Sequence, residues 1–269
     1  MSASPAPARV REAYRYCLDL ARRHYENFPV ASRAVPARLR GPIAAIYAFA
    51  RTADDFADEG TRTPEERLAL LEEYGRRLDA MAAGDPHDTP GDAPVFIALG
   101  DACRNYRLPL TLFHDLLDAF RQDVTKKRYA DFAEVMDYCR RSANPVGRLL
   151  LHLYGEASPE RLARSDAVCS ALQLINFLQD IGQDYHECGR IYLPQDDMRA
   201  CGVGEDAISA GRTDAAMLRL VELQVVRIRA LYATGAPLGR ELRGRLGLEL
   251  RLILSGARRV LDKLAAERV

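Results

Sequence analysis

The sequence predicts an all-α protein. Apolar residues recur at helical spacing along almost the whole chain, whereas alternating runs of valine, isoleucine and aromatic residues between turns are nearly absent. Leucine, alanine, arginine and glutamate dominate a composition that is 48% hydrophobic and 28% charged, which favours helices in a globular chain. A chain of 269 residues is long enough to bury a sizeable core.

The periodicity predicts about ten helices joined by mostly short connections. Their expected ranges, in chain order, are 7–24, 37–59, 64–83, 93–106, 109–123, 130–143, 146–154, 158–185, 213–233 and 237–265. The turn-rich stretch 83–92 spans only about ten residues, so it connects helices rather than domains. Because no self-similar period of roughly 20 to 50 residues is present, residues 1–269 are expected to form a single domain.

Charge and cysteine usage exclude several classes of protein. Lys plus Arg and Asp plus Glu are both 38, so no net basic field attracts nucleic acid, and none is expected as a partner. The six cysteines are scattered without a CxxC pair, which predicts reduced thiols rather than disulfides or a zinc site. Residues 1–7 lack the basic and apolar regions of a signal peptide, and no stretch approaches the roughly 18 to 20 apolar residues of a membrane span. A cytoplasmic location is therefore expected.

Acidic residues gather in one predicted helix near residue 50. Spacings of three and four residues put most of the polar members on one helical face. These members are Tyr47, Arg51, Asp54, Asp55 and Asp58. Ile43, Ile46 and Phe56 share the segment, so the helix is expected to pack in the core.

A second stripe of oxygen-bearing side chains recurs at three, four and four residues. Its members are Gln173, Asn176, Asp180 and Asp184. Ionised carboxylates in apolar surroundings cost several kcal/mol each unless cations neutralise them. Hard oxygen ligands without His or Cys favour Mg²⁺, which binds carboxylates together with substrate phosphate oxygens. The two stripes together predict a magnesium site for a diphosphate; the alternative for each stripe is a solvated helix face or an N-cap cluster.

These motifs resemble the squalene and phytoene synthase family along nearly the whole chain. The residues that carry the resemblance are Tyr47-x-x-x-Arg51-x-x-Asp54-Asp55-x-x-Asp58, Tyr138-Cys139, Gln173-x-x-Asn176-x-x-x-Asp180-x-x-x-Asp184 and Gly189-Arg190-Ile191-Tyr192-Leu193-Pro194. The resemblance implies the class I terpenoid synthase fold, with helices around a central apolar cavity that the two aspartate clusters face.

The resemblance also implies roles for individual residues. The implied magnesium ligands are Asp54, Asp58, Asn176, Asp180 and Asp184, with Asp55 as an additional ligand. Arg51 and Arg190 would steady the diphosphate, and Tyr47, Tyr138 and Gln173 would lie near the reacting carbons. For the two tyrosines, core packing, carbocation stabilisation by the ring and orientation of a proton or water by the hydroxyl all remain open.

The chain departs from the common family pattern at two places. Asn144 replaces a usual glycine before Pro145. It either preserves a helix break, because asparagine tolerates left-handed backbone angles, or adds an amide that holds a water molecule or the departed diphosphate. The stretch from His24 to Ser32 carries Tyr25 and Glu26 where relatives show a Ser-Lys pair that contacts diphosphate.

These departures resemble the hydroxysqualene synthase branch of bacterial hopanoid biosynthesis. The branch implies that presqualene diphosphate ionises and rearranges and that water attacks, with Mg²⁺ or Mn²⁺ as cofactor and no NADPH. It also implies coupling to other enzymes of that pathway. The first alternatives are a presqualene diphosphate, squalene or phytoene synthase, and a remote one is a non-catalytic helical assembly factor.

The last predicted helix favours one further alternative. It combines seven basic residues from Arg240 to Lys263 with many leucines. Such a helix either packs in the core with a solvated basic face or makes peripheral contact with the inner face of a membrane.

Overall fold

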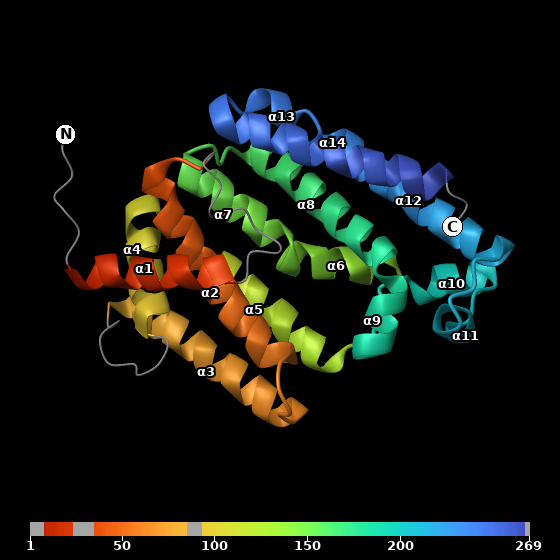
Figure 1. Ribbon diagram of the computed structural model, residues 1–269, viewed down its shortest axis with the longest axis horizontal. Helices are drawn as coiled ribbons and strands as arrows, with labels where there is room; N and C mark the ends of the chain where they lie inside the picture. The colour runs from red at the N-terminus through yellow and green to blue at the C-terminus, as the bar shows by residue number, and fades with distance from the viewer. Residues whose placement is uncertain (1–7, 24–34, 85–92, 267–269) are drawn as a thin grey trace. The chain divides into compact units, whose positions relative to one another are not determined.

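The computed structural model describes residues 8–23, 35–84 and 93–266 of the chain. Within these ranges every regular element is an α-helix (Figure 1), which confirms the all-α prediction. The helices are α1 Ala8–Arg23, α2 Ala37–Asp58, α3 Pro64–Ala83, α4 Ala93–Tyr106, α5 Leu110–Thr125, α6 Phe132–Ser142, α7 Asn144–Tyr154, α8 Pro159–Gln179, α9 Ile181–Cys188, α10 Gln195–Cys201, α11 Glu205–Ser209, α12 Ala215–Gly235, α13 Leu238–Glu241 and α14 Gly244–Ala266.

Local signals set several of these helix ends. The Thr63 hydroxyl accepts the Glu66 N–H while the Glu66 carboxylate accepts the Thr63 N–H, so a capping box starts α3. Ser158 and Asp214 cap α8 and α12 in the simpler way, with a side-chain oxygen accepting a backbone N–H of the first turn. Gly84, in the left-handed conformation at φ 99°, ends α3.

Contacts divide the chain into two compact units, described here one at a time. The first comprises Met1–Val124 and Leu149–Glu156, and the second comprises Thr125–Arg148 and Ala157–Val269. The single domain expected from the sequence stays a prediction.

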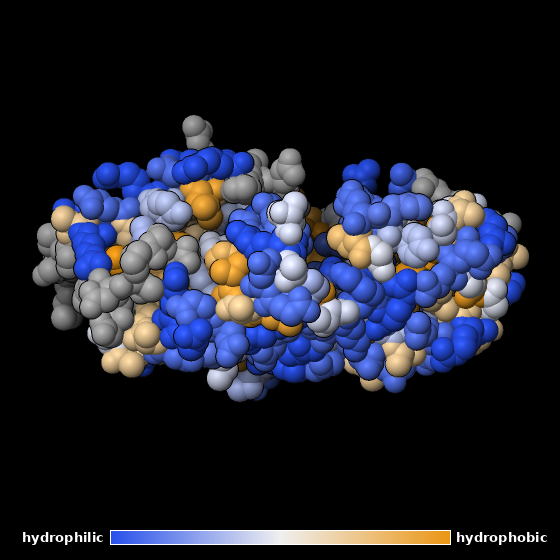
Figure 2. Space-filling model, turned by 90° about the horizontal axis from the view of Figure 1, so that it is seen from below, coloured by the Kyte–Doolittle hydropathy of each residue, from blue (hydrophilic) through white to orange (hydrophobic). Residues whose placement is uncertain are grey.

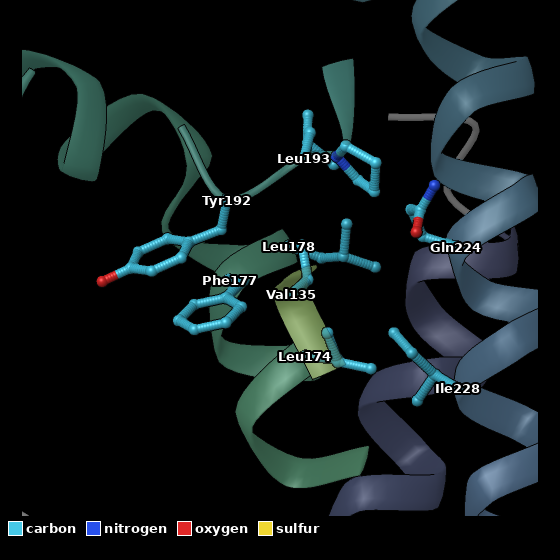
Figure 3. Close-up of a pocket in the computed structure, with 9 residues that line it drawn as sticks. Val135, Leu174, Phe177, Leu178, Tyr192, Leu193, Gln224 and Ile228 are labelled. Atoms are coloured by element: carbon cyan, nitrogen blue, oxygen red, sulfur yellow. The ribbon is translucent and has the colours of Figure 1, made fainter. Parts of the chain in front are cut away.

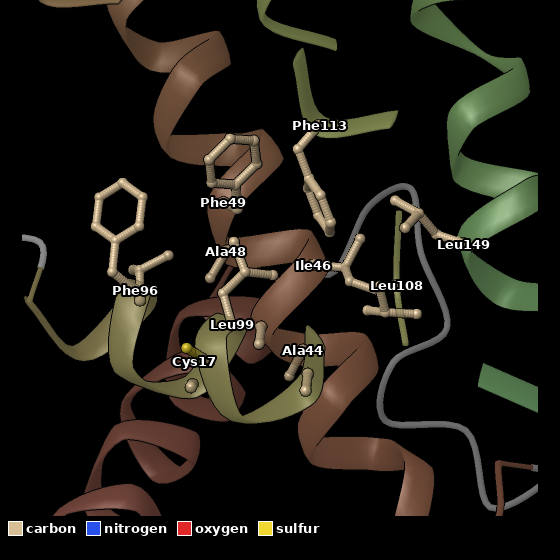
Figure 4. Close-up of a cluster of buried hydrophobic side chains, with 14 of the residues drawn as sticks. Cys17, Ala44, Ile46, Ala48, Phe49, Phe96, Leu99, Leu108, Phe113 and Leu149 are labelled. Carbon is tan, nitrogen blue, oxygen red and sulfur yellow. The ribbon is translucent and has the colours of Figure 1, made fainter. Parts of the chain in front are cut away.

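The core of the first unit is built around α2, which packs against α1, α3 and α4. Phe49 is fully buried, and its ring lies 5.0 Å from Tyr74, 5.3 Å from Phe113 and 6.2 Å from Phe96, measured between centroids (Figure 4). Small side chains let the neighbouring helices approach α2 closely. The fully buried alanines of α2 are Ala44, Ala45, Ala48 and Ala53. The interior of this helix is thus fixed in place up to the turn that carries its aspartates.

In the second unit α12 packs along α8, and α14 packs against α12 and α13. Gly235 makes the α8–α12 approach possible, because a Cβ there would lie 2.6 Å from the Val168 side chain. A buried polar group joins α10 to α12: Asp197 accepts the Gln224 amide at 2.9 Å and is ion-paired with Arg227. Arg227 in turn lies 4.5 Å from the centroid of the Phe132 ring.

The structure corrects several predicted boundaries. The helix expected over 158–185 is broken at Asp180, whose ψ of 13° separates α8 from α9. The helix expected over 237–265 is divided, because Leu242 is extended at ψ 129° and Gly244 has a φ of 65°. The short helices α10 and α11 were not predicted, since seven and five residues are too few to display a helical period.

The surface seen in Figure 2 is mainly hydrophilic, with hydrophobic residues in small groups between polar ones. None of the helices that the structure describes combines the length and apolar character that a membrane span requires.

Candidate active site

The first aspartate cluster lies at the carboxyl end of α2. Asp54, Asp55 and Asp58 occupy its last two turns, Glu59 follows directly, and the last turn of this helix holds no basic residue. The carboxyl end of a helix carries partial negative charge from its terminal carbonyl groups. Four carboxylates therefore accumulate where the helix itself disfavours them, and a bound cation would relieve the repulsion.

Arg51 supplies part of the missing positive charge. Its Nη2 lies 2.6 Å from Asp55 Oδ1, its Nη1 lies 3.4 Å from Asp54 Oδ2, and it also pairs with Glu59. Its Nε is buried and has no hydrogen-bond partner among the described residues. Arg51 thus serves the cluster as an internal counter-ion.

The charge balance of the cluster is weakest at Asp54. Burial and the neighbouring Asp58 together raise the pKa of this carboxyl to about 7, and Arg51 only partly offsets the shift. Asp55 and Asp123 contribute to the rise. The side chain keeps 39% of its surface exposed, so solvent reaches the carboxylate. A hard divalent cation fits this set of carboxylate oxygens.

Asp123 belongs to the surroundings of the first cluster but was missed in the sequence. It lies in α5 and raises the pKa of Asp54. The sequence does contain a pattern that could have indicated Asp123. Leu112, Leu116 and Ala119 are buried, and Asp123 continues their spacing of three and four residues. An acidic residue on an otherwise apolar helical face is a reason to expect a ligand or a cation nearby.

Tyr47 lies two turns before Asp54 and is half-buried. Burial raises the pKa of its hydroxyl, Arg51 opposes that shift, and Asp55 and Asp54 add to it. The hydroxyl therefore keeps its proton at neutral pH and can act as a hydrogen-bond donor.

The second stripe lies in the other unit and spans the break between α8 and α9. The Asp180 N–H donates to Asn176 O at 2.9 Å, and the Asp184 N–H donates to Asp180 O at 2.8 Å, so the backbone ladder continues through the bend. Asn176 and Asp180 are exposed, whereas Gln173 and Asp184 are half-buried. The burial cost expected for the ionised carboxylates of this stripe is therefore wrong for Asp180, which is exposed.

Arg190 is held next to the second stripe by a glycine turn. Gly189 adopts φ 63°, and its N–H donates to Tyr185 O at 2.9 Å. The Arg190 N–H then donates to Asp184 O at 3.0 Å, and its Nη1 donates to the Tyr192 hydroxyl at 2.9 Å. Backbone hydrogen bonds from Ile191 to Lys127 and from Gln195 to Tyr129 anchor the following segment.

Tyr138 lies in a cluster of four aromatic rings in the second unit. Tyr192 stacks on Phe177 at 3.6 Å between centroids (Figure 3), and Tyr138 lies 5.7 Å from Tyr192 and 6.1 Å from Phe177. Tyr129 completes the cluster at 5.5 Å from Tyr192. Tyr138 is 5% exposed. The roles of Tyr129 and Tyr192 as its neighbours were not predicted, because they depend on packing of distant segments.

Beside this cluster, the second unit contains a small apolar pocket. Its walls come from α6, α8, α12 and the segment after Arg190 (Figure 3). The lining residues are Val135, Leu174, Phe177, Leu178, Tyr192, Leu193, Pro194, Gln224 and Ile228. None of the predicted site residues is among them. The pocket's interior volume of about 10 Å³ holds about one water molecule.

Asn144 begins α7 and is buried, with 7% of its surface exposed. Its side-chain Oδ1 accepts a hydrogen bond from the Ser170 hydroxyl of α8 at 3.0 Å. The expected helix break is present at Ala143, between α6 and α7. The expectation of a left-handed angle is wrong, because among the described residues only Arg107 combines a side chain with a positive φ.

The predicted site residues are distributed over both units. The carboxylates of α2 surround Arg51 in the first unit, whereas the predicted site residues of the second unit are Tyr138, Asn144, Gln173, Asn176, Asp180, Asp184 and Arg190. Within the described ranges, no three His, Cys, Asp or Glu side chains converge as a metal-binding group. The departure from His24 to Ser32 lies outside the described residues.

Comparison with known proteins identifies the class. Residues 21–268 match the squalene/phytoene synthase family. The chain is 40% identical over 240 residues to a protein of Rhodopseudomonas palustris named hydroxysqualene synthase, covering 89% of this chain and 79% of that one. It is 32% identical over 229 residues to a phytoene synthase of Mycobacterium bovis, covering 84% and 73%.

The fold agrees. The crystal structure of squalene synthase HpnC from Alicyclobacillus acidocaldarius is similar with a TM-score of 0.89 and 36% identity, covering 98% of this chain and 97% of that one. The chain belongs to the squalene/phytoene synthase family, whose members act on prenyl diphosphates.

Proposed function

We propose that the chain is a hydroxysqualene synthase, a carbon–oxygen lyase that converts presqualene diphosphate and water into hydroxysqualene and inorganic diphosphate. The observation that carries this proposal is the 40% identity to a hydroxysqualene synthase, against 32% to a phytoene synthase. The bond from carbon to diphosphate oxygen breaks, the cyclopropylcarbinyl cation rearranges, and a bond to the water oxygen forms. The water proton passes to solvent or to the leaving diphosphate.

Departure of the diphosphate starts this reaction, and two arginines are suited to assist it. Negative charge develops on the leaving oxygens, and guanidinium groups stabilise it by charge-assisted hydrogen bonds. Arg51 lies among the carboxylates of α2, with Nη2 2.6 Å from Asp55 Oδ1, and Arg190 is oriented by the Tyr192 hydroxyl at 2.9 Å.

The carboxylates would hold the divalent cations that the family typically uses. When bound, Mg²⁺ or Mn²⁺ supplies Lewis-acid stabilisation of the leaving diphosphate. The residues proposed to bind it are Asp54, Asp55, Asp58, Asn176, Asp180 and Asp184. The raised pKa of Asp54 and the four acidic residues at the carboxyl end of α2 support this assignment.

The aromatic cluster is suited to stabilise the carbocation. Faces of aromatic rings attract cations by roughly 0.5–2 kcal/mol each. Tyr138 is the proposed contact, with Tyr129, Phe177 and Tyr192 holding its ring. Tyr47, which keeps its proton, would orient water or the leaving group, with Gln173 as a second polar contact.

Asn144 is proposed to hold the water that captures the cation. Ser170 occupies its Oδ1, which fixes the orientation of the amide and leaves Nδ2 as the donor of that side chain. A donor that binds the water oxygen, or the departed diphosphate, would control where the new bond forms.

A second candidate is favoured by one comparison. The protein from Alicyclobacillus acidocaldarius, similar over 98% of this chain, is named a squalene synthase, and squalene formation requires a hydride donor. Presqualene diphosphate or phytoene formation from two prenyl diphosphates is the other chemistry of the family.

Both aspartate motifs are complete, which disfavours a non-catalytic assembly factor. In the proposed role the protein works in the cytoplasm, coupled to other hopanoid-pathway enzymes.

The proposal is tested by incubating purified protein with presqualene diphosphate and Mg²⁺ in ¹⁸O-labelled water, with and without NADPH. We expect an alcohol that carries the label, in equal yield with and without NADPH. Parallel incubations with farnesyl or geranylgeranyl diphosphate test the condensation reactions. Squalene formed only with NADPH, or products only from the shorter diphosphates, would overturn the assignment but leave the family membership intact.

A further inference from the structure

The outward face of α14 exposes large apolar side chains. Leu248 is 53% exposed, Leu252 is 65% exposed and Ile253 is 42% exposed. In the described part of the chain only two other large hydrophobic residues are as exposed, Tyr16 and Val226. Leu248 and Leu252 are four residues apart, so they lie one turn apart on the same side of the helix.

These leucines are not needed for packing within the second unit. The opposite side of α14 is buried through Gly247, Leu254, Ala257 and Leu261. Its orientation is fixed by the Tyr232 hydroxyl, which donates to the Leu254 carbonyl at 3.2 Å. Close packing on Gly239 also fixes the orientation of α14, because a Cβ at that glycine would lie only 3.1 Å from the Leu254 side chain. The helix is thus held with its two leucines outward.

Positive charge surrounds the exposed leucines. Between residues 243 and 259 the exposed charged side chains are all basic: Arg243, Arg245, Arg251, Arg258 and Arg259. The acidic residue of this stretch is Glu249, which is half-buried, and burial raises the pKa of its carboxyl. Further along, Asp262 is paired with Arg229 and Arg258. A complementary partner therefore has an anionic surface and an apolar interior.

We propose that α14 binds the surface of an anionic lipid bilayer. Leu248 and Leu252 enter the boundary between headgroups and acyl chains, while Arg245, one turn before the leucine pair, and Arg259, two turns after it, contact lipid phosphates. A helix with basic and apolar residues on its exposed face is suited to lie in this interface, and each basic residue near the surface adds to the attraction of anionic lipid.

The same face is poorly suited to bind a second copy of the chain. A two-fold symmetric interface brings a surface patch against itself. The arginines beside the leucine pair would then face the same arginines of the second copy, and like charges across an interface oppose association. An anionic bilayer neutralises these charges and also accepts the leucines.

The test uses the full chain in co-sedimentation with vesicles of phosphatidylcholine alone or of phosphatidylcholine with phosphatidylglycerol. We expect binding only with phosphatidylglycerol, decreasing as salt is raised. Replacing both leucines, Leu248→Ser with Leu252→Ser, should lower the partition coefficient at least about tenfold, as should Arg245→Glu with Arg259→Glu. Both pairs are exposed, so the circular dichroism spectrum should not change.

Val226→Ser is the matched control. Val226 is 61% exposed on α12 but lies one turn from Glu222 and Arg229, in surroundings without excess positive charge, so its replacement should leave binding unchanged. Wild-type protein that fails to bind anionic vesicles at low salt overturns the proposal, as does undiminished binding by the double leucine variant. A dimer in light scattering that the same leucine variant dissociates would assign the face to a second copy instead.

Discussion

At the scale of single residues, Asp54 shows how the fold prepares a site for a cation. Its pKa is raised from 3.8 to about 7 by burial and by three neighbouring carboxylates. Folding therefore makes Asp54 bind its proton more tightly than the unfolded chain does. The stability contributed by that proton is complete below about pH 3.8 and is lost as the pH rises through about 7.

This linkage predicts a pH dependence for the metal-free protein. In urea titrations with chelator, the free energy of unfolding should fall between about pH 4 and pH 7, and Asp54→Asn should lose that component of the fall. Adding Mg²⁺ at the higher pH should restore stability in the wild type only. An unchanged slope in the variant would show that Asp54 titrates in its ordinary range.

Asp54 and Asp180 also allow a direct test of both clusters. Because cation-assisted departure of diphosphate is proposed as the start of the reaction, Asp54→Asn and Asp180→Asn should each lower turnover at least about 100-fold. Asp19→Asn, which removes an exposed carboxylate paired with Arg22 on α1, is the matched control. Near-normal turnover by either variant, with an unaltered circular dichroism spectrum, would remove that aspartate from the site.

Variants of Asn144 and Ser170 distinguish a role of the Asn144 amide in the reaction from a role in packing. Asn144→Gly removes the amide and its hydrogen bond from Ser170, whereas Ser170→Ala removes only the hydrogen bond. If the amide directs water, the glycine variant should form less alcohol and more eliminated or rearranged hydrocarbon. The alanine variant should retain mostly alcohol. If both variants change the product ratio from that of the wild type by the same amount, the hydrogen bond from Ser170 matters and the amide donor of Asn144 does not.

At the scale of helices, the approach of α7 to α8 depends on Gly147. A Cβ at this position would lie 2.4 Å from Ser165 Oγ and 2.5 Å from Cys169 Sγ. Gly147→Ala should therefore lower the free energy of unfolding by about 1–3 kcal/mol. In Gly256→Ala, where a Cβ would meet no atom within 4 Å, the same measurement by urea titration should show a gain of up to about 1 kcal/mol. An alanine at 147 without cost would mean that the two helices can separate readily.

The helices also show what a sequence pattern can and cannot predict. Long amphipathic segments such as α2 and α12 were predicted closely, because their apolar faces follow one period over many turns. The break at Asp180 was not predicted, because the polar stripe of α8 continues through the bend into α9. In the site, the spacing from Arg51 to Asp58 correctly predicted a shared helical face. Asp123 was missed because tertiary packing within the first unit brings it near Asp54, and Tyr192 was missed because packing within the second unit brings it against Tyr138.

At the scale of the whole molecule, metal dependence should be separable from folding. The apolar core around Phe49 includes no predicted metal ligand. Chelator should therefore abolish turnover and leave the helical circular dichroism signal nearly unchanged. Mn²⁺ should restore activity, and Zn²⁺ should not, because zinc prefers nitrogen and sulfur ligands. A metal-free preparation with full activity would contradict the proposed reaction.

The glycine turn after α9 has a thermodynamic consequence for the order of binding events. Through it the Asp184 carbonyl accepts the Arg190 N–H at 3.0 Å, so a proposed metal ligand and a proposed diphosphate ligand share one rigid backbone segment. An ion that restricts the motion of Asp184 also restricts Arg190, and the entropy lost in the first event is not lost again in the second. Cation and diphosphate would then bind with positive cooperativity, and each would slow the release of the other.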